Sequence, residues 1–376
     1  MANFDVVVVG LGIMGSAALH ALARRGRRVI GIERFEPGHD RGSSHGLTRI
    51  IRLGYYEHPS YVPLVRRAYE LWRDVEARSG RSLLTVSGII EIGAADSALI
   101  KGTLASAQAH SLRHEQLDAR TVMERFPAFR LPSDFVGVFQ PDGGYLAAEP
   151  AIDTQIALAR AAGAETRTGE AVLAIEPHGD GVRVVTERTV FEAGSTIVAA
   201  GPWLEQLFPG LADNVRVTRQ VVLWLEPRGG PAPFAPDKFP VFMLESTHGM
   251  HYGFPFDRRA GLKVAKHFHE EETADPEHYE RAVSAADEAL IRTAIEEYLP
   301  AANGKLRSAK TCLYTMTQDG DFILDHLPGY SQIVIASPCS GHGFKFAPVI
   351  GDILADLATG APTPHDISRF RLSRLD

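Results

Sequence analysis

The sequence predicts an α/β fold in which a Rossmann-type nucleotide-binding domain is interleaved with a mostly antiparallel-sheet domain. Three observations predict this fold class. The chain begins with a buried strand, a glycine-rich turn, a helix and a second strand, all within its first 33 residues. Two distant segments, 194–203 and 331–348, repeat the pattern of a buried strand that ends in small residues and glycine. Between them, residues 215–267 contain several strand-like runs, which predict a second sheet.

The N-terminal segment has the β-α-β pattern that binds dinucleotides. Its strand, helix and second strand are predicted at 4–9, 16–25 and 28–32. The turn contains Gly10, Gly12, Ile13, Met14 and Gly15. The first glycine permits a tight turn, the second lets the backbone approach a pyrophosphate, and the third lets helix and strand pack closely. The helix N-terminus then faces the phosphates with unpaired N–H groups and partial positive charge.

Glu33 lies at the tip of the second strand, 18 residues after Gly15. A carboxylate at this position is placed to accept hydrogen bonds from an adenosine ribose, and it disfavours a 2′-phosphate. We therefore expect FAD or NAD rather than NADP. A glycine-rich turn without a ligand would not account for the strand, helix and acid together.

The composition excludes several classes of function. The chain has 376 residues, 45% of them hydrophobic, which suits a soluble globular protein of two domains. Its formal charge of -7 argues against a nucleic-acid partner, because no basic surplus is present to neutralise phosphates. No apolar run approaches the roughly 18 residues of a membrane span, and no signal peptide is recognisable. We expect a cytoplasmic protein whose two cysteines form no disulfide framework.

The remaining elements follow from apolar periodicity and turn residues. Helices are predicted at 61–79, 95–111, 118–126, 150–162, 287–298 and 349–359. Strands are predicted at 83–93, 135–139, 165–175, 181–186, 194–203, 215–226, 239–244, 261–267 and 331–336, with turns at 141–144 and 250–255. The strands at 165–175 and 181–186 are expected to form a small sheet of their own.

Two loops are unusually rich in glycine. Residues 38–52 combine Gly, Ser, His and Arg, which suits either a loop over an anionic or electron-rich ligand or a solvated basic loop. Residues 340–348 form a glycine-rich turn between a buried strand and a helix. This second turn is uninformative for a nicotinamide enzyme, but it suits the docking of a flavin ring and ribityl chain.

Five separated segments resemble the monomeric sarcosine oxidase and N-methyltryptophan oxidase family of flavin-dependent amine oxidases. They lie at 42–52, 252–255, 261–263, 311–315 and 340–346, in the family's order. The resemblance implies the FAD fold of D-amino-acid oxidase and glutathione reductase. It implies an FAD-binding domain of residues 1–85, 145–215 and 308–376, and a substrate-binding domain of residues 86–144 and 216–307.

The resemblance also implies the mode of cofactor binding. Cys312 matches the cysteine that forms a thioether to the flavin 8α-methyl carbon, whereas from the sequence alone a single buried cysteine is a small hydrophobe. Cys339 has no such counterpart and is interpreted as pocket lining. The residues expected to bind FAD are Gly10, Gly12, Ile13, Met14, Gly15, Glu33, Arg34, Ser43, Ser44, His45, Arg49, Val172, Gly201, Trp203, Cys312, Gly341, His342, Gly343, Phe344 and Lys345.

Substrate-binding residues are implied in the same way. Arg52 and Lys345 match the pair that binds the substrate carboxylate, since two cations on separate loops make a clamp for a planar anion. Tyr252, His267 and Tyr314 match residues that line the substrate site. His267 and His269 also permit a metal-binding interpretation, but no acid or cysteine stands at ligand spacing, so we predict no metal site.

Catalytic roles are implied for four residues. Lys263 matches the lysine beside the flavin at which oxygen reacts, where an ammonium group stabilises negative charge. His45 and Arg49 match residues near the flavin face, and His267 faces the amine.

The expected reaction is oxidation of sarcosine or another N-methyl amino acid to an imine, which hydrolyses to an amino acid and formaldehyde while oxygen becomes hydrogen peroxide. Alternatives with the same fold are an oxidase of L-pipecolate or N-methyltryptophan and a flavin dehydrogenase with another acceptor. An NAD-dependent dehydrogenase and a nucleotide-sensing binding protein are the alternatives from other classes. We expect a monomer that works on small molecules and contacts neither nucleic acid nor membrane.

Three departures from the family leave the identity of the amine open. Leu47 stands where sarcosine oxidases carry an acid, and Tyr56 stands where the relatives tend to have glycine. Pro338 and Cys339 replace the usual Gly-Phe pair. We expect all three departures near the substrate side of the site.

Overall fold

The central strand of the fold is β1 (Phe4–Val9), which is buried on both faces in the computed structural model. The structure describes residues 4–270 and 272–375. Val6 and Val8 belong to a hydrophobic cluster shared with the surrounding helices, whereas Val7 and Val9 belong to a second cluster on the opposite face. A continuous apolar run is needed because both faces of a parallel sheet are covered.

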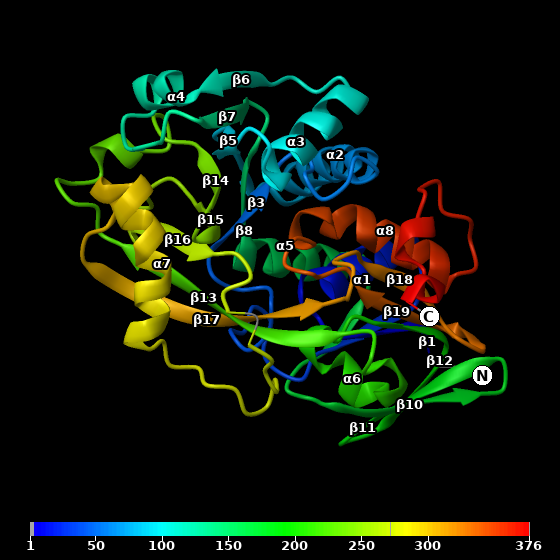
Figure 1. The fold of residues 1–376 in the computed structure, drawn as a ribbon. Helices are drawn as coiled ribbons and strands as arrows, with labels where there is room; N and C mark the ends of the chain where they lie inside the picture. The colour runs from blue at the N-terminus through cyan, green and yellow to red at the C-terminus, as the bar shows by residue number, and fades with distance from the viewer. Residues whose placement is uncertain (1–3, 271, 376) are drawn as a thin grey trace.

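The first sheet holds the nucleotide-binding pattern (Figure 1). Its order is β10-β11-β12-β1-β2-β9, with β19 beside β12 and β18 beside β19. The strands are β2 (Val29–Ile32), β9 (Glu165–Arg167), β10 (Val172–His178), β11 (Gly181–Thr186), β12 (Val190–Val198), β18 (Ile323–Leu327) and β19 (Tyr330–Ser337). Helices α1 (Ile13–Arg24), α5 (Ala148–Ala161) and α8 (Ala347–Ala358) pack together on one face, and α2 (Tyr61–Ser79) lies beyond them.

The second sheet is mostly antiparallel and lies mainly in the left half of Figure 1. Its order is β17-β13-β16-β15-β14-β5-β7-β6. The strands are β5 (Ile89–Ala94), β6 (Glu115–Asp118), β7 (Phe135–Gln140), β13 (Arg216–Leu225), β14 (Val241–Ser246), β15 (Gly249–Gly253), β16 (Leu262–Lys266) and β17 (Leu306–Met316). Helices α3 (Ala98–Ala109), α4 (Ala119–Arg125) and α7 (Ala285–Tyr298) flank it.

A small third sheet lies between the other two. It consists of β3 (Thr48–Ile51), β8 (Gly144–Ala147) and β4 (Leu84–Val86), in the order β3-β8-β4. The short helix α6 (Leu204–Leu207) follows the end of β12. Because β3 continues the glycine-rich loop after β2, this sheet carries residues of the first domain toward the second.

The α/β class and the predicted helices are confirmed, with ends that shift by a few residues. Two strand predictions were wrong. Residues 83–93 are not one strand, because Gly88 takes a φ of +74° and separates β4 from β5, which join different sheets. Residues 165–175 and 181–186 do not form a separate small sheet. Gly169, with φ +62°, separates β9 from β10, and both strands extend the first sheet at opposite edges.

A third wrong prediction is the turn at 250–255, most of which is strand β15. The proposed domain boundaries stay a prediction; the boundary at 308 falls inside β17, which pairs along β13 in the second sheet.

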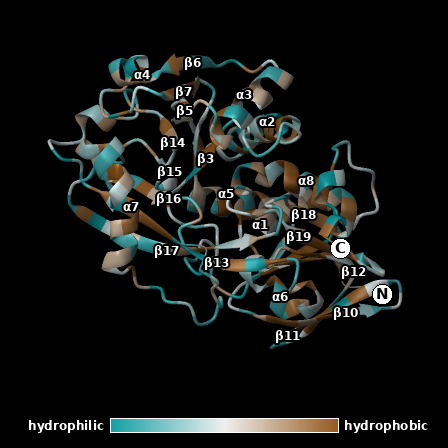
Figure 2. Ribbon diagram, in the orientation of Figure 1, coloured by the Kyte–Doolittle hydropathy of each residue, from teal (hydrophilic) through white to brown (hydrophobic). Residues whose placement is uncertain are grey.

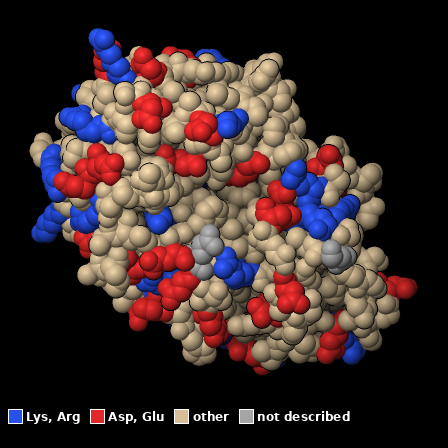
Figure 3. Space-filling model, viewed as in Figure 1, with Lys and Arg blue, Asp and Glu red and all other residues tan. Residues whose placement is uncertain are grey.

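The distribution of hydrophobic and charged residues fits this fold. Figure 2 shows hydrophobic residues, in brown, concentrated on the strands of the first sheet, around β12 and β19. Figure 3 shows basic and acidic side chains intermingled on one face of the molecule. Within the described residues, no helix is both long and apolar enough to cross a membrane.

Candidate active site

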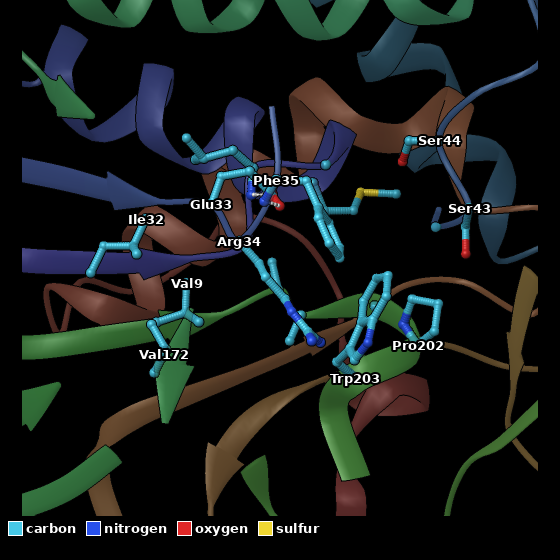
Figure 4. A pocket seen from close by; sticks show the side chains of 18 of the residues that line it. Val9, Ile32, Glu33, Arg34, Phe35, Ser43, Ser44, Val172, Pro202 and Trp203 are labelled. Atoms are coloured by element: carbon cyan, nitrogen blue, oxygen red, sulfur yellow. Dashed lines mark hydrogen bonds between the residues drawn. The ribbon is translucent and has the colours of Figure 1, made fainter. Parts of the chain in front are cut away.

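A cavity of about 350 Å³ lies at the carboxyl ends of β1, β2 and β12, and is called the nucleotide cavity below. Figure 4 shows Val172 near one end of its lining and Ser43 and Ser44 near the other, with Glu33 and Trp203 between them. The predicted FAD-binding residues that line it are Gly10, Gly12, Ile13, Met14, Glu33, Arg34, Ser43, Ser44, Val172, Gly201 and Trp203. The carboxyl ends of parallel strands are where α/β sheets bind ligands.

The glycine turn leaves room only for backbone. A Cβ on Gly10, whose φ is +87°, would come within 2.5 Å of the Ala199 carbonyl oxygen. A Cβ on Gly15 would come within 1.8 Å of the Gly10 oxygen, which explains the close packing of helix on strand. Helix α1 has neither a side-chain N-cap nor an acid in its first turn. Its N-terminal N–H groups therefore fit a phosphate.

Glu33 is buried in the nucleotide cavity at the end of β2. Its carboxylate accepts hydrogen bonds from the backbone N–H groups of Leu11 (2.8 Å) and Phe35 (2.9 Å). These bonds fix the carboxylate at the edge of the glycine turn, as expected for a ribose-binding acid. Arg34 is exposed at the rim, where it pairs with Glu277 and lies 5.9 Å from the Trp203 ring.

A second, smaller cavity of about 70 Å³ lies beyond the nucleotide cavity, and is called the inner cavity below. The two cavities meet along one loop, because Ser43 and Ser44 line the first while His45 lines the second. The inner cavity is lined by His45, Arg49, Ile50, Arg52, Glu57, Val222, Met243, Tyr252, Phe254, His267, Cys312, Tyr314, Gly341, His342, Phe344 and Lys345. The structure thus brings all the predicted substrate-binding residues together.

Several buried polar atoms between the cavities have no hydrogen-bond partner within the protein. They include both ring nitrogens of His45 and the hydroxyl oxygens of Ser43 and Thr48. Burial, reinforced by the charge of Arg49, lowers the pKa of His45 to about 3, so its ring is neutral. Buried polar groups in native proteins nearly always have partners. These atoms therefore fit a bound group that brings its own donors and acceptors.

Lys263 points from β16 toward the same loop. Its Nζ donates to the carbonyl oxygens of Gly46 (2.7 Å) and Thr48 (2.8 Å) and lies 4.9 Å from the ring centre of Phe254. Burial, together with the charge of Arg49, lowers the pKa of this amine well below its usual value. In a low-dielectric site, the interaction energy between a fixed amine and a charge that develops beside it is large.

The two predicted carboxylate-binding cations meet in the inner cavity, although they lie 293 positions apart in the sequence. Nη2 of Arg52 already donates to both carboxylate oxygens of Glu57, at 2.7 and 2.8 Å. Lys345 Nζ donates to the carbonyl oxygen of His342 at 2.6 Å, and burial lowers its pKa to about 7. Both side chains are nearly inaccessible to solvent, so an anion would meet them in a low-dielectric site.

Aromatic residues form one wall of the inner cavity. The Tyr314 hydroxyl lies 3.5 Å from Nδ1 of His267, and the Tyr252 ring lies 6.4 Å from the His267 ring. Burial lowers the pKa of His267 to about 3 and raises that of Tyr252 to about 12, so both groups are neutral at pH 7. A neutral wall facing two cations suits a ligand that is anionic at one end and uncharged at the other.

The two cysteines lie in different cavities and are not bonded to each other. Cys312 is on β17, opposite Gln220, and lines the inner cavity, where burial raises the pKa of its thiol. Cys339 lines the nucleotide cavity, which confirms its interpretation as pocket lining. Among the described residues, no group of three or more metal-ligating side chains is placed to hold a metal ion.

The three departures from the family lie at different places relative to the inner cavity, and their position near the substrate stays a prediction. Leu47 is 46% exposed, with φ +70°, and lines neither cavity, while Pro338 and Cys339 line the nucleotide cavity. Of the three, Tyr56 lies close to the inner cavity, with its ring 4.8 Å from the Arg52 guanidinium. Its hydrophobic neighbours, including Met243, explain why a bulky ring is accommodated there.

Gly343 and His342 stabilise the turn before α8 through contacts within the protein. A Cβ on Gly343 would come within 1.6 Å of the Pro338 carbonyl oxygen, so only glycine allows the turn to close. The ring nitrogens of His342 meet the Tyr55 hydroxyl (2.7 Å) and the Gly320 carbonyl oxygen (2.9 Å). Both ring nitrogens of His342 are therefore occupied by hydrogen-bond partners within the protein.

Sequence reasoning missed three acids that organise the site. Glu57 pairs with Arg52, Glu91 lies behind it, and Glu149 accepts from the N–H groups of Gly46 (2.7 Å) and Leu47 (3.0 Å). Glu91 left a visible signal, because it interrupts the apolar run Ile89-Ile90-Glu91-Ile92. An acid at a core position of a strand is costly unless it has a specific partner.

Comparisons with known proteins agree with this geometry. The model of a family described as FAD dependent oxidoreductase matches residues 5–357. A monomeric sarcosine oxidase of Streptomyces avermitilis is 39% identical over 99% of this chain and 98% of its own. An N-methyl-L-tryptophan oxidase of Salmonella typhi is 37% identical over 99% of each chain. The solved structure of NikD, an unusual amino acid oxidase of nikkomycin biosynthesis, superposes with a TM-score of 0.86 at 28% identity, covering 99% of this chain and 98% of NikD.

Proposed function

Because this chain belongs to the FAD-dependent oxidoreductases, in the family of monomeric sarcosine oxidase and N-methyltryptophan oxidase, we propose that it oxidises the secondary amine of a small amino acid. The substrate is sarcosine or another N-methyl or cyclic amino acid, and oxygen is reduced to hydrogen peroxide. When bound, FAD accepts two electrons and a hydrogen from the carbon next to the amine nitrogen.

The observation that carries the proposal is the inner cavity itself. Two cations from distant segments, Arg52 and Lys345, share it with a neutral wall of His267 and Tyr314. Its volume of about 70 Å³ favours a compact substrate. The unpartnered atoms of Ser43 and His45, at the junction with the nucleotide cavity, support placing the reactive end of the cofactor there.

Each residue then has a defined task. Arg52 and Lys345 hold the carboxylate, which turns the amine toward the junction of the two cavities. The neutral ring of His267 accepts hydrogen bonds near the amine without repelling it. Lys263 stabilises negative charge on oxygen as it is reduced. The imine product hydrolyses after release; from sarcosine this gives glycine and formaldehyde.

A panel of amines with a peroxide readout tests the substrate class. We expect sarcosine, L-pipecolate or another compact N-alkyl amino acid to exceed dimethylamine in kcat/KM by about 100-fold, because dimethylamine lacks the carboxylate that two cations would bind. N-methyl-L-tryptophan should be poorer because of its indole. Equal rates for dimethylamine and the amino acids would contradict the proposal. Bleaching of the yellow colour without peroxide would indicate an acceptor other than oxygen.

Covalent attachment of FAD through Cys312 belongs to the same proposal. After acid denaturation, we expect the flavin mass and yellow colour to stay with the wild-type chain and to be lost from the Cys312→Ser variant. Cys339→Ser is the matched control, because Cys339 lines the other cavity, and it should keep both signals. Release of flavin from the denatured wild-type protein would disprove the covalent link to Cys312, but it would not change the assignment of the chain to the family. The monomeric state and cytoplasmic location expected from the sequence stay predictions.

A further inference from the structure

Arg52 faces a second carboxyl group in addition to Glu57. Glu91 on β5 is fully buried, and its Oε1 lies 3.7 Å from Nη1 of Arg52 without a hydrogen bond of its own. Its other oxygen accepts a hydrogen bond from Gln140 Nε2 at 2.5 Å. Gln140 is itself fixed, because its Oε1 accepts from the N–H of Gly54 at 2.6 Å. The carboxyl group thus faces the cation and has no exposed surface.

The charges of this cluster balance before any ligand binds when Lys345 is protonated and both carboxylates are ionised. Arg52 and Lys345 supply two positive charges, and Glu57 and Glu91 supply two negative charges when both are ionised. A substrate carboxylate adds a third negative charge to a buried site, and an uncompensated buried charge is strongly unfavourable. The cluster stays neutral if one of its own carboxylates takes up a proton.

We propose that Glu91 is a positioning residue of the carboxylate clamp, which takes up a proton from solvent when a substrate carboxylate binds to Arg52 and Lys345. This inference rests on the proposed function, because it requires a substrate that carries a carboxylate. Glu91 lines neither cavity and acts through the charge of Arg52, whose Nη1 lies 3.7 Å from its Oε1.

The surroundings select Glu91 rather than Glu57 as the proton acceptor. Burial raises the pKa of Glu91 to about 7, against the opposing effect of Arg52. Burial also acts to raise the pKa of Glu57, but Arg52, His342 and Lys345 together hold that pKa below its usual value. Glu57 has two direct bonds to the guanidinium, whereas Glu91 has none.

The groups that face Glu91 come from each neighbouring element. The loop after β3 contributes Arg52, Glu57 and the phenol of Tyr56. Strand β7 contributes the neutral amide of Gln140, and α3 contributes the neutral hydroxyl of Thr103. The cross-strand neighbour on β14 is apolar Met243. Arg52 and Glu57 are thus the charged groups that set its protonation.

The test uses the FAD-loaded enzyme and propionate, a carboxylate without an amine to oxidise. Binding is followed by the flavin absorbance, and proton uptake by titration calorimetry in two buffers of different ionisation enthalpy. Above about pH 7, each group that must gain a proton raises the Kd by about tenfold per pH unit. For the wild type we expect contributions from both Glu91 and Lys345, whose pKa is also about 7.

Glu91→Gln keeps the size of the side chain and removes its titration. We expect this variant to take up about one proton fewer than the wild type at about pH 8.5. Its Kd should rise about tenfold per pH unit, compared with about 100-fold for the wild type, because only the Lys345 contribution remains. Gln140→Met removes the amide that donates to Glu91. It should move the Glu91 contribution to the rise in Kd to higher pH and leave the Lys345 contribution near pH 7, because a carboxylate that loses a donor is easier to protonate.

The outcomes separate the two proposals. Equal proton uptake by the wild type and Glu91→Gln would overturn the role of Glu91 while leaving the clamp intact. Failure of the wild type to bind propionate at any pH would instead overturn the clamp, and with it both proposals. If Glu91→Gln does not fold, a Gln140→Met variant whose Kd rises as steeply as that of the wild type at every pH, or a wild type without proton uptake, still overturns the role of Glu91.

Discussion

Replacing Lys263 with methionine should slow the reaction of the reduced enzyme with oxygen by about 100-fold to 1,000-fold, which is the usual effect of losing one electrostatic group aimed at developing charge. Methionine keeps the length and apolar packing of the side chain but removes its charge. The lysine is suited to this task because two carbonyl oxygens, of Gly46 and Thr48, fix its Nζ in the junction region. Burial lowers the pKa of Lys263, so negative charge beside it would favour its protonated form.

The measurement separates the two half-reactions by stopped flow. Anaerobic reduction by the amine should change little in Lys263→Met, and reoxidation by oxygen should account for the loss in turnover. Lys266→Met is a matched control on the same strand, because the Lys266 side chain lies against Gly249 and not against the carbonyl oxygens of Gly46 and Thr48. A variant that reoxidises as fast as the wild type would remove Lys263 from the oxygen reaction.

Replacing Lys345 with glutamine should lower kcat/KM for a carboxylate substrate by about 10-fold to 150-fold, which corresponds to the loss of one charge-assisted hydrogen bond of about 1.5–3 kcal/mol. Glutamine can still donate to the His342 carbonyl oxygen, so the local turn is kept. The loss should fall mainly on KM, since the carboxylate is bound equally before and during the reaction.

The pH dependence gives a second readout for the same residue. Burial and Arg52 lower the pKa of Lys345 to about 7, so its charge is present below that pH and is lost as the pH rises through it. The wild-type KM should therefore increase above about pH 7, and Lys345→Gln should lose this component. Lys238→Gln, at an exposed lysine, is the control. A Lys345→Gln variant with unchanged KM and an unchanged pH profile would contradict the carboxylate clamp.

The sequence by itself determined the nucleotide-binding half of this protein. Strand, glycine turn, helix and acid lie within 33 residues, and their geometry follows from local rules: Gly10 needs a positive φ, and Gly15 allows no Cβ. The cofactor and the list of site residues came from family resemblance, which links segments as distant as Arg52 and Lys345. The structure brings these segments into adjoining cavities.

Tertiary structure alone decided how the strands divide between sheets and how the cations of the site are paired. Apolar alternation predicts a strand near 83–93 but not that Gly88 sends its two halves to different sheets. It marks Glu91 as an anomaly without revealing that Arg52 is its partner. The family pattern does not reveal that Leu47 is exposed and lines neither cavity. These features depend on pairings between distant segments and on burial, which are fixed by packing of the whole chain rather than by local spacing.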